Sequence, residues 1–147
     1  MIKIHKKVRD WMIPVSLTLF AYAILKFVLL IGYAPSASMT PTLPERSLVI
    51  GYRWFEELQV GDIIIFERDG VLMVKRIAAV PGDSLDLREL RYMTSVPIPV
   101  WEEPIINIPE NCYFVLGDNS DNSWDSRYWE DPYVRLDNIR AKIWIPK

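Results

Sequence analysis

The sequence contains one cysteine, Cys112, and one histidine, His5, and this scarcity excludes several kinds of chemistry. A single cysteine cannot close a disulfide within the chain. One histidine and one cysteine cannot supply a His/Cys zinc cluster, so we expect no metal and no cofactor. Cys112 begins an apolar run that ends at Leu116, which predicts a buried strand and favours a core cysteine over a reactive one.

Only one apolar run is long enough to cross a membrane. Residues 11–31 are nearly all apolar, and about 20 such residues span a hydrocarbon core of about 30 Å as a helix. Lys26 lies toward the end of this run, where its stem can reach the interface, so we expect the span at about residues 11–27. A cleaved signal peptide is the alternative, because small residues follow at positions 36–38.

Basic residues predict the orientation of this span. Four precede it and none follows before Arg46; the four are Lys3, Lys6, Lys7 and Arg9. The positive-inside rule then places residues 1–10 in the cytoplasm, 11–32 in the anchor and juxtamembrane segment, and 33–147 outside. The chain is therefore expected to be a single-pass protein of the cell membrane. His5 would lie on the cytoplasmic side, too far away to serve a Ser-His-Asp triad or a Cys-His pair outside.

The outer part of the chain is acidic. Residues 33–147 carry 12 basic and 18 acidic residues, for a net charge of −6. Nucleic-acid-binding domains have the opposite balance, so we expect no nucleic-acid partner. Nothing in the pattern indicates an obligate protein partner either.

Short apolar runs between turn residues predict a mainly β fold for the outer part. β-branched and apolar runs indicate strands, and Asp69-Gly70 is typical of a tight hairpin turn. We expect strands at residues 47–52, 63–68, 71–80, 84–88, 112–116 and 139–145. No amphipathic helix is evident outside the apolar run. Several short strands favour a barrel or a pair of packed sheets.

Residues 35–43 follow the apolar run and contain two serines close together. Pro35 and Pro41 interrupt regular structure on either side of Ser36 and Ser38. One interpretation is a flexible linker that leaves a membrane anchor. The other is a nucleophilic serine held in place at the membrane face.

A nucleophilic serine would need a base, and only three lysines follow the apolar run: Lys75, Lys142 and Lys147. Lys75 lies in the middle of an apolar strand, where burial of an ammonium is costly. Burial lowers the pKa of a lysine, and a shift from about 10.4 to about 8 takes roughly 3 kcal/mol. The neutral amine could then accept the Ser38 Oγ proton. The alternative is a lysine at a strand edge whose head reaches solvent.

Residues 117–128 form a third polar stretch. Asp118, Asp121 and Asp125 could ligate calcium, although their spacing does not fit an EF-hand. A solvated loop is the simplest interpretation. In a third interpretation the loop folds over the site, with Ser123 orienting a lysine and Asp125 pairing with Arg127.

Taken together, these stretches resemble the boxes of bacterial type I signal peptidase. Residues 35–43 resemble its P-S-x-S-M-x-P-T-L box, and residues 61–66 its G-D-hydrophobic strand. Residues 74–83 resemble its K-R-hydrophobic and P-G-D box, and residues 114–128 its G-D-N-R-D-N-S-x-D-S-R box. The resemblance covers most of the chain.

The resemblance implies a signal-peptidase-like β catalytic domain behind one transmembrane helix, with roles for nine residues. Ser38 would be the nucleophile and Lys75 the general base. The Ser36 hydroxyl and the Ser38 N–H would form the oxyanion hole. The remaining residues would support the site: Ser123 as a hydrogen-bond partner of Lys75, Asp125 with Arg127 and Arg76 with Asp118 as ion pairs, and Met39 beneath the nucleophile. The substrates implied are exported preproteins cleaved after small residues at −1 and −3, with the lipid bilayer as the other partner.

The chain departs from the family pattern at two positions. Ser120 stands where Arg is usual, and Glu130 where Gly is common. The extra β domain of larger members would be absent or reduced to residues 84–109. A specialised peptidase of the conjugation type is an alternative within the family. Outside it, the alternatives are a self-cleaving repressor-type Ser-Lys protease, disfavoured by the anchor and the acidic domain, and a membrane-tethered β module that does not cut.

Overall fold

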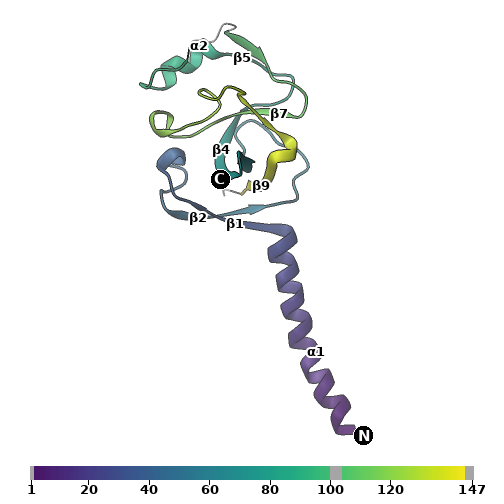
Figure 1. Cartoon of the computed structure of the whole chain (residues 1–147). Helices are drawn as coiled ribbons and strands as arrows, with labels where there is room; N and C mark the ends of the chain where they lie inside the picture. The colour runs from purple at the N-terminus through teal and green to yellow at the C-terminus, as the bar shows by residue number, and fades with distance from the viewer. Residues whose placement is uncertain (1, 100–103, 145–147) are drawn as a thin grey trace.

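A computed structural model describes residues 2–99 and 104–144, and in it one long helix projects from a β domain (Figure 1). Helix α1 (Ile2–Ala23) continues into a π-helical turn, Ile24–Val28. Residues Asp10–Val28 have a mean hydropathy of 1.7, and none of them is buried. This is the one helix in the described residues long and apolar enough to cross a membrane, in line with the predicted anchor.

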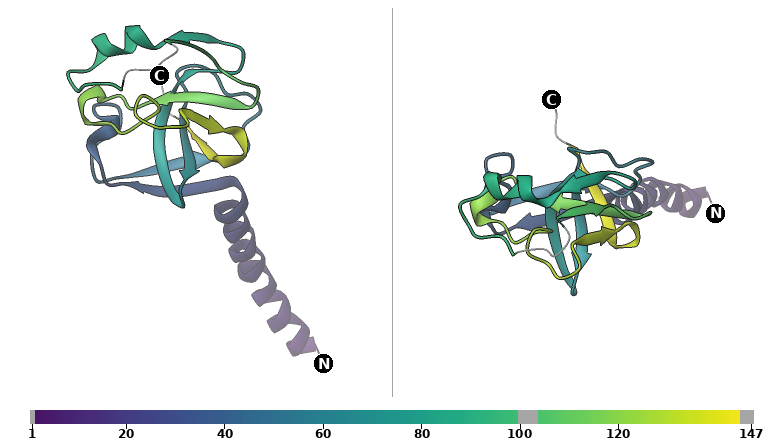
Figure 2. Two further views of the ribbon diagram at one scale, coloured as in Figure 1. Left: turned by 45° about the horizontal axis from the view of Figure 1, so that its top comes forward. Right: turned by 90° about the horizontal axis from the view of Figure 1, so that it is seen from above.

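The β domain is built on one seven-stranded antiparallel sheet and one two-stranded sheet (Figures 1 and 2). The larger sheet has the order β1-β2-β9-β3-β4-β7-β8. Its strands are β1 (Leu29–Ala34), β2 (Ser47–Tyr52), β3 (Ile63–Arg68), β4 (Val71–Ala79), β7 (Cys112–Leu116), β8 (Tyr133–Arg135) and β9 (Ile139–Ile143). The smaller sheet pairs β5 (Ser84–Asp86) with β6 (Ile105–Asn107). The predicted mainly β fold is confirmed.

The predicted hairpin joins β3 and β4 through two residues with positive φ. Asp69 has φ 52° and Gly70 has φ 76°, the backbone that a tight hairpin turn requires. The turn fixes a register in which Arg68 pairs with Val71, and along the same ladder Ile64 faces Lys75. The hairpin thus decides which side of the sheet Lys75 occupies.

The structure contains three strands and a helix that the sequence pattern did not predict. Strand β1 lies in the segment expected to be juxtamembrane, and β6 and β8 have three residues each. The strand predicted through residue 88 was wrong at its end: β5 stops at Asp86, whose carboxylate accepts the Arg88 N–H and caps a one-turn helix, α2 (Leu87–Leu90). The final strand ends at Ile143.

The core lies on both faces of β3. All four residues 63–66 are at most 2 % exposed, because β3 is a central strand. Ile64 and Phe66 pack into one cluster with Ile77, whereas Ile63 and Ile65 pack into another with Met39. Each fully buried aliphatic or aromatic side chain of this kind contributes roughly 1.5–3 kcal/mol. A third cluster, which includes Cys112, joins β7 to α2.

Candidate active site

The serines at positions 36 and 38 lie on a short turn between β1 and β2. Residues Ala37–Met39 form one turn of 3-10 helix, closed by a hydrogen bond from the Thr40 N–H to the Ala37 carbonyl. Met39 is 2 % exposed and packs into the core, which anchors the turn from below. The Ser36 hydroxyl donates to Ser38 Oγ at 3.2 Å, so the two serine side chains lie together.

Lys75 is buried in the middle of β4. Its side chain is 3 % exposed, and its cross-strand neighbour is the fully buried Ile64. Burial lowers the pKa of Lys75 from 10.5 to about 8; Asp125 works against this shift and Arg127 adds to it. A lysine of this kind exists in part as the neutral amine near neutral pH.

Ser36, Ser38, Lys75 and Ser123 line one cavity of about 580 Å³. A second cavity of equal volume lies against β1, β2 and β9, but its lining holds no carboxylate, lysine or arginine. The first of these two cavities is therefore the one whose lining includes a lysine beside the serine hydroxyls. It combines two hydroxyls next to each other with an amine of lowered pKa.

The Lys75 amine forms no hydrogen bond with Ser38 or Ser123 among residues 2–99 and 104–144. The Ser123 hydroxyl is buried and has no hydrogen-bond partner in this part of the chain. The hydrogen bond from Ser123 to Lys75 that the resemblance implied is thus not formed in the structure, although both residues line the same cavity. Catalytic hydrogen bonds are often long without substrate and shorten in the complex.

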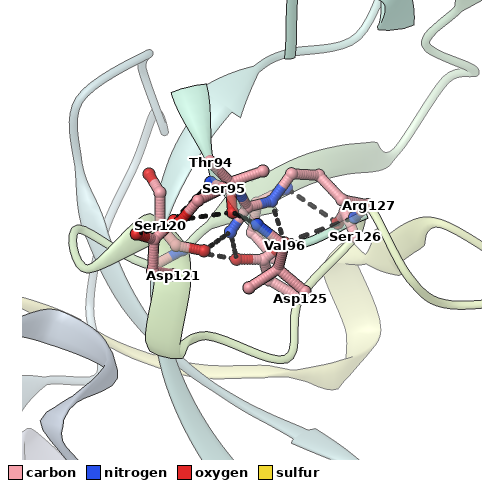
Figure 3. Close-up of polar contacts among 10 residues, drawn as sticks. Thr94, Ser95, Val96, Ser120, Asp121, Asp125, Ser126 and Arg127 are labelled. Atoms are coloured by element: carbon pink, nitrogen blue, oxygen red, sulfur yellow. Dashed lines mark hydrogen bonds and ion pairs between the residues drawn. The ribbon is translucent and has the colours of Figure 1, made fainter. Parts of the chain in front are cut away.

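The loop at residues 117–128 is held by a buried ion pair (Figure 3). Asp125 is 0 % exposed and Arg127 1 %, and both guanidinium bonds to the carboxylate measure 2.8 Å. The same carboxylate accepts the Gly117 N–H at 2.9 Å, which ties the loop to the end of β7. Arg127 also donates to the Ser120 carbonyl at 3.0 Å. Because this contact uses the backbone, the change from Arg to Ser at position 120 leaves it intact.

A second ion pair joins β4 to the 117–128 loop. The Arg76 guanidinium forms two bonds with the Asp118 carboxylate, at 2.7 and 2.6 Å. It also donates to the Gly61 carbonyl at 2.7 Å and to Thr42 Oγ1 at 3.2 Å. One side chain next to Lys75 therefore connects the segment that carries the serines, the start of the β3 hairpin and the loop.

Asn119 and Gly117 allow the 117–128 loop to pack closely against the segment that carries the serines. The Asn119 N–H donates to the Ser38 carbonyl at 3.0 Å, and the Asn119 side chain donates to the Ala37 carbonyl at 3.2 Å. A Cβ at Gly117 would lie 2.6 Å from the Ser38 carbonyl oxygen and would overlap the Ser123 side chain. This approach requires glycine. Sequence reasoning missed Asn119, whose role depends on the fold.

The calcium interpretation of the loop is wrong for the described residues. The three carboxylates engage separate partners: Asp118 binds Arg76, Asp121 accepts bonds from Thr94 and Ser95, and Asp125 binds Arg127. Residues 2–99 and 104–144 contain no group of three acidic, His or Cys side chains that could hold a metal ion.

The other lysines of the outer domain are not equivalent to Lys75. Lys142 on β9 pairs with Asp62 at 2.6 Å, and its side chain is 19 % exposed. Lys142 does not line the cavity that contains Ser38. Lys147 lies outside the described residues. Lys75 is thus the only described lysine in the cavity with Ser38.

Comparison with known proteins agrees with the resemblance of the sequence. The chain matches the family described as "Signal peptidase, peptidase S26" over residues 8–94 and 88–146. It is 33 % identical over 144 residues to signal peptidase I of Leptolyngbya laminosa, covering 81 % of this chain and 68 % of that protein. It is 31 % identical over 136 residues to probable signal peptidase I-2 of Synechocystis sp., covering 78 % of this chain and 62 % of that protein.

The chain spans about three fifths of the length of this Synechocystis relative. A crystal structure of a signal peptidase I from Enterococcus faecalis superimposes with a TM-score of 0.41 at 25 % identity, covering 60 % of this chain and 97 % of that chain. Because the family match extends over nearly all of residues 8–146, the chain belongs to the signal peptidase family, peptidase S26.

Proposed function

We propose that this chain is a membrane-bound serine endopeptidase that removes signal peptides from exported preproteins, with Ser38 as the nucleophile and Lys75 as the general base. One observation carries the proposal: a lysine that is 3 % exposed lines the same cavity as Ser38. Burial of an ammonium without use would be a pure cost to the fold. Here burial lowers the pKa of Lys75, so that the amine can accept a proton in a reaction.

The lowered pKa of Lys75 makes it a usable base at neutral pH. With a pKa of about 8, about a tenth of the amine is neutral at pH 7, whereas an ordinary lysine is neutral to only a few parts in ten thousand. The gain is of the order of 300-fold in base concentration. A pKa near the operating pH also favours proton transfer in both directions.

The reaction proceeds in two balanced halves. Neutral Lys75 takes the Ser38 Oγ proton as Oγ attacks the carbonyl carbon of the scissile bond. The resulting ammonium then donates this proton to the leaving amine as the C–N bond breaks, which leaves an ester on Ser38. Water, deprotonated by the same amine, attacks the ester, and Ser38 recovers its proton from Lys75.

Two donors are available for the oxyanion of each tetrahedral intermediate. They are the Ser38 N–H and the Ser36 hydroxyl, which donates to Ser38 Oγ in the absence of substrate. Once Oγ has bonded to the carbonyl carbon, the Ser36 hydroxyl is free to turn to the oxyanion. Donors that act mainly on charge developing in the transition state lower the barrier rather than merely strengthening substrate binding.

The anchor explains why the substrates would be preproteins. Helix α1 leads directly through the turn at residues 24–28 into β1, and β1 leads into the segment that carries Ser38. A site joined so closely to a membrane helix is expected at the outer surface of the cell membrane, with residues 1–10 in the cytoplasm. There it meets the end of a signal peptide that still spans the bilayer, and small residues at −1 and −3 precede the cut.

Cleavage of a preprotein by the full-length protein in detergent or lipid tests the proposal. Wild type is compared with Ser38→Ala and Lys75→Ala, and with Lys142→Ala as a matched control that removes a lysine from a strand outside the cavity. We expect wild type and Lys142→Ala to cut once, after a small residue, and the other two variants to be inactive.

Cleavage by Lys75→Ala would mean that a group other than Lys75 is the base. Binding without cleavage by a folded wild type would favour the tethered module, and a narrow choice of preproteins would favour a specialised peptidase.

A further inference from the structure

Residues 94–97, after α2, form part of the wall of the catalytic cavity. Val96 and Pro97 line it together with Met73 from β4 and two aromatic residues from the 117–128 loop, Trp124 and Tyr128. The two aromatic rings are stacked, with centroids 5.3 Å apart and an interplanar angle of 16°. Trp124 is 62 % exposed, so an apolar surface next to Ser38 and Lys75 is open to a bound chain.

The 94–97 segment cannot be fixed by a regular strand ladder. Pro97 and Pro99 have no N–H to donate, and strand pairing requires one at every second residue. The Val96 N–H is used within the segment, because it donates to Thr94 Oγ1 at 3.1 Å. The position of this wall must therefore come from side-chain contacts.

Asp121, in the 117–128 loop, supplies these contacts to Thr94 and Ser95 (Figure 3). One carboxylate oxygen accepts the Ser95 N–H at 2.7 Å and the Thr94 hydroxyl at 2.9 Å. The other accepts the Ser95 hydroxyl at 2.6 Å. Within residues 2–99 and 104–144, these three are the hydrogen bonds that join the 94–97 segment to the 117–128 loop.

Asp121 itself stands on a rigid base. The Ser120 carbonyl just before it is held by buried Arg127, and the Asn122 N–H just after it donates to the Asn119 carbonyl at 3.0 Å. Asn119 in turn is bonded to the Ser38 carbonyl. A short chain of hydrogen bonds through Asp121 and Asn119 thus links the 94–97 segment to Ser38 and fixes the distance between them.

We propose that Asp121 is a positioning residue that holds Val96 and Pro97 at a fixed distance from Ser38, and that this wall with the Trp124–Tyr128 stack forms a subsite for an apolar side chain of the preprotein flanking the scissile bond. The inference rests on the proposed function. The subsite favours apolar over charged side chains, because a charge that is placed against Val96, Pro97, Met73 and the two rings would lose water and gain no polar partner from these groups. Release of the 94–97 segment would widen the subsite and weaken this preference.

The test uses Asp121→Ala in the full-length protein, with Asp137→Ala as the matched control, since Asp137 is also an exposed aspartate on a 3-10 turn. Hydrogen exchange of the peptide covering residues 91–99 reports the contact itself, without reference to activity. Steady-state cleavage is then measured on preproteins that keep small residues at −1 and −3 and carry either leucine or aspartate at each other position flanking the cut in turn.

We expect faster exchange at 91–99 in Asp121→Ala alone, a rise in KM for the leucine substrate of about tenfold with a smaller change in kcat, and a reduced preference for leucine over aspartate at one position. Asp121→Asn, which keeps one acceptor oxygen, should give values between those of wild type and Asp121→Ala.

Faster exchange with unchanged KM and unchanged preference would overturn the inference, as would a 91–99 peptide that exchanges equally fast in wild type. An equal loss of kcat for every substrate would assign Asp121 a merely structural role. A wild type that protects this peptide but cleaves no preprotein would instead contradict the proposed function, and with it this role.

Discussion

The Asn119 N–H donates a 3.0 Å hydrogen bond to the carbonyl oxygen of Ser38, and this contact fastens the 117–128 loop to the segment that carries both serines. Ser123 and Asp125 lie in the same loop, and Arg76 forms an ion pair with Asp118 of this loop. The geometry around Ser38 and Lys75 therefore depends on packing between segments that are distant in sequence. Changes in these contacts should therefore lower cleavage even though none of the contacting residues reacts with the substrate.

Gly117→Ala should abolish most cleavage. The new Cβ would lie 2.6 Å from the Ser38 carbonyl and overlap the Ser123 side chain, so the loop must move away from Ser38. Overpacking of this kind costs about 1–3 kcal/mol of stability, which leaves the protein folded. Gly70→Ala is the control: it has positive φ but open space around it, so it should lose some stability and retain cleavage. Full activity in Gly117→Ala would contradict the close approach.

Asp125→Ala should be among the most destabilising single changes in the domain. It would leave the Arg127 guanidinium, 1 % exposed, without its counter-charge, and would remove the acceptor of the Gly117 N–H. Loss of one partner of a buried pair costs about 3–5 kcal/mol. Denaturant unfolding measures this loss, with Glu45→Ala as the control for an exposed pair 3.8 Å apart. A change in stability no larger than that of the control would disprove the structural role of the buried pair.

Arg76→Lys keeps the charge next to Lys75 and tests the geometry of the guanidinium. A lysine cannot reproduce the four hydrogen bonds that Arg76 makes to Asp118, Gly61 and Thr42. Because the pair is partly exposed, we expect a stability loss of only about 1 kcal/mol. Cleavage should fall about tenfold or more, because a misplaced site loses rate steeply. Arg88→Lys, an exposed bidentate pair with Asp86, should cleave like wild type, and equal activity in both variants would refute the prediction.

The strands of the hairpin could be predicted from sequence, whereas other elements could not. Residues 63–66 and 71–80 are mostly apolar runs on either side of an Asp-Gly turn, and this local pattern suffices to predict β3 and β4. Strand β1 directly follows the apolar run of the anchor, so nothing in its composition separates it from the membrane segment. Strands β6 and β8 have three residues each, too few for any periodicity to show.

The candidate site shows the same division. The resemblance to the family's boxes grouped Ser38, Lys75 and the 117–128 loop in one site, and the pairing of Asp125 with Arg127 was predicted for two residues close together in sequence. The contacts of Arg76 with Gly61 and Thr42 could not be predicted, because they depend on how three segments meet in space. The same holds for Asp121, whose partners Thr94 and Ser95 lie in a stretch without a recognisable motif.

Lys75→Met should stabilise the protein at neutral pH while it abolishes cleavage. The folded-state pKa of Lys75 is about 8, lower than its ordinary 10.5, so the unfolded chain binds more protons between these values. Stability therefore rises with pH from about 8 to 10.5, and at pH 7 the wild type bears a cost of about 3 kcal/mol that methionine removes. Denaturant unfolding should show this difference at pH 7 and less than about 1 kcal/mol at pH 10. A Lys75→Met variant less stable than wild type at pH 7 would show that burial of the Lys75 ammonium does not destabilise the folded protein.

The most direct test of the Ser38–Lys75 assignment is kcat/KM for one preprotein as a function of pH. Lys75 must be neutral to accept the Ser38 proton, so the rate should rise as pH increases and level off above a midpoint near 8, the pKa that burial gives this lysine. Asp125→Asn, if folded, removes the carboxylate that raises this pKa and should move the midpoint to lower pH. A rate that shows no step near pH 8, or one that persists in Lys75→Ala with the same midpoint, would contradict the assignment of Lys75 as the base.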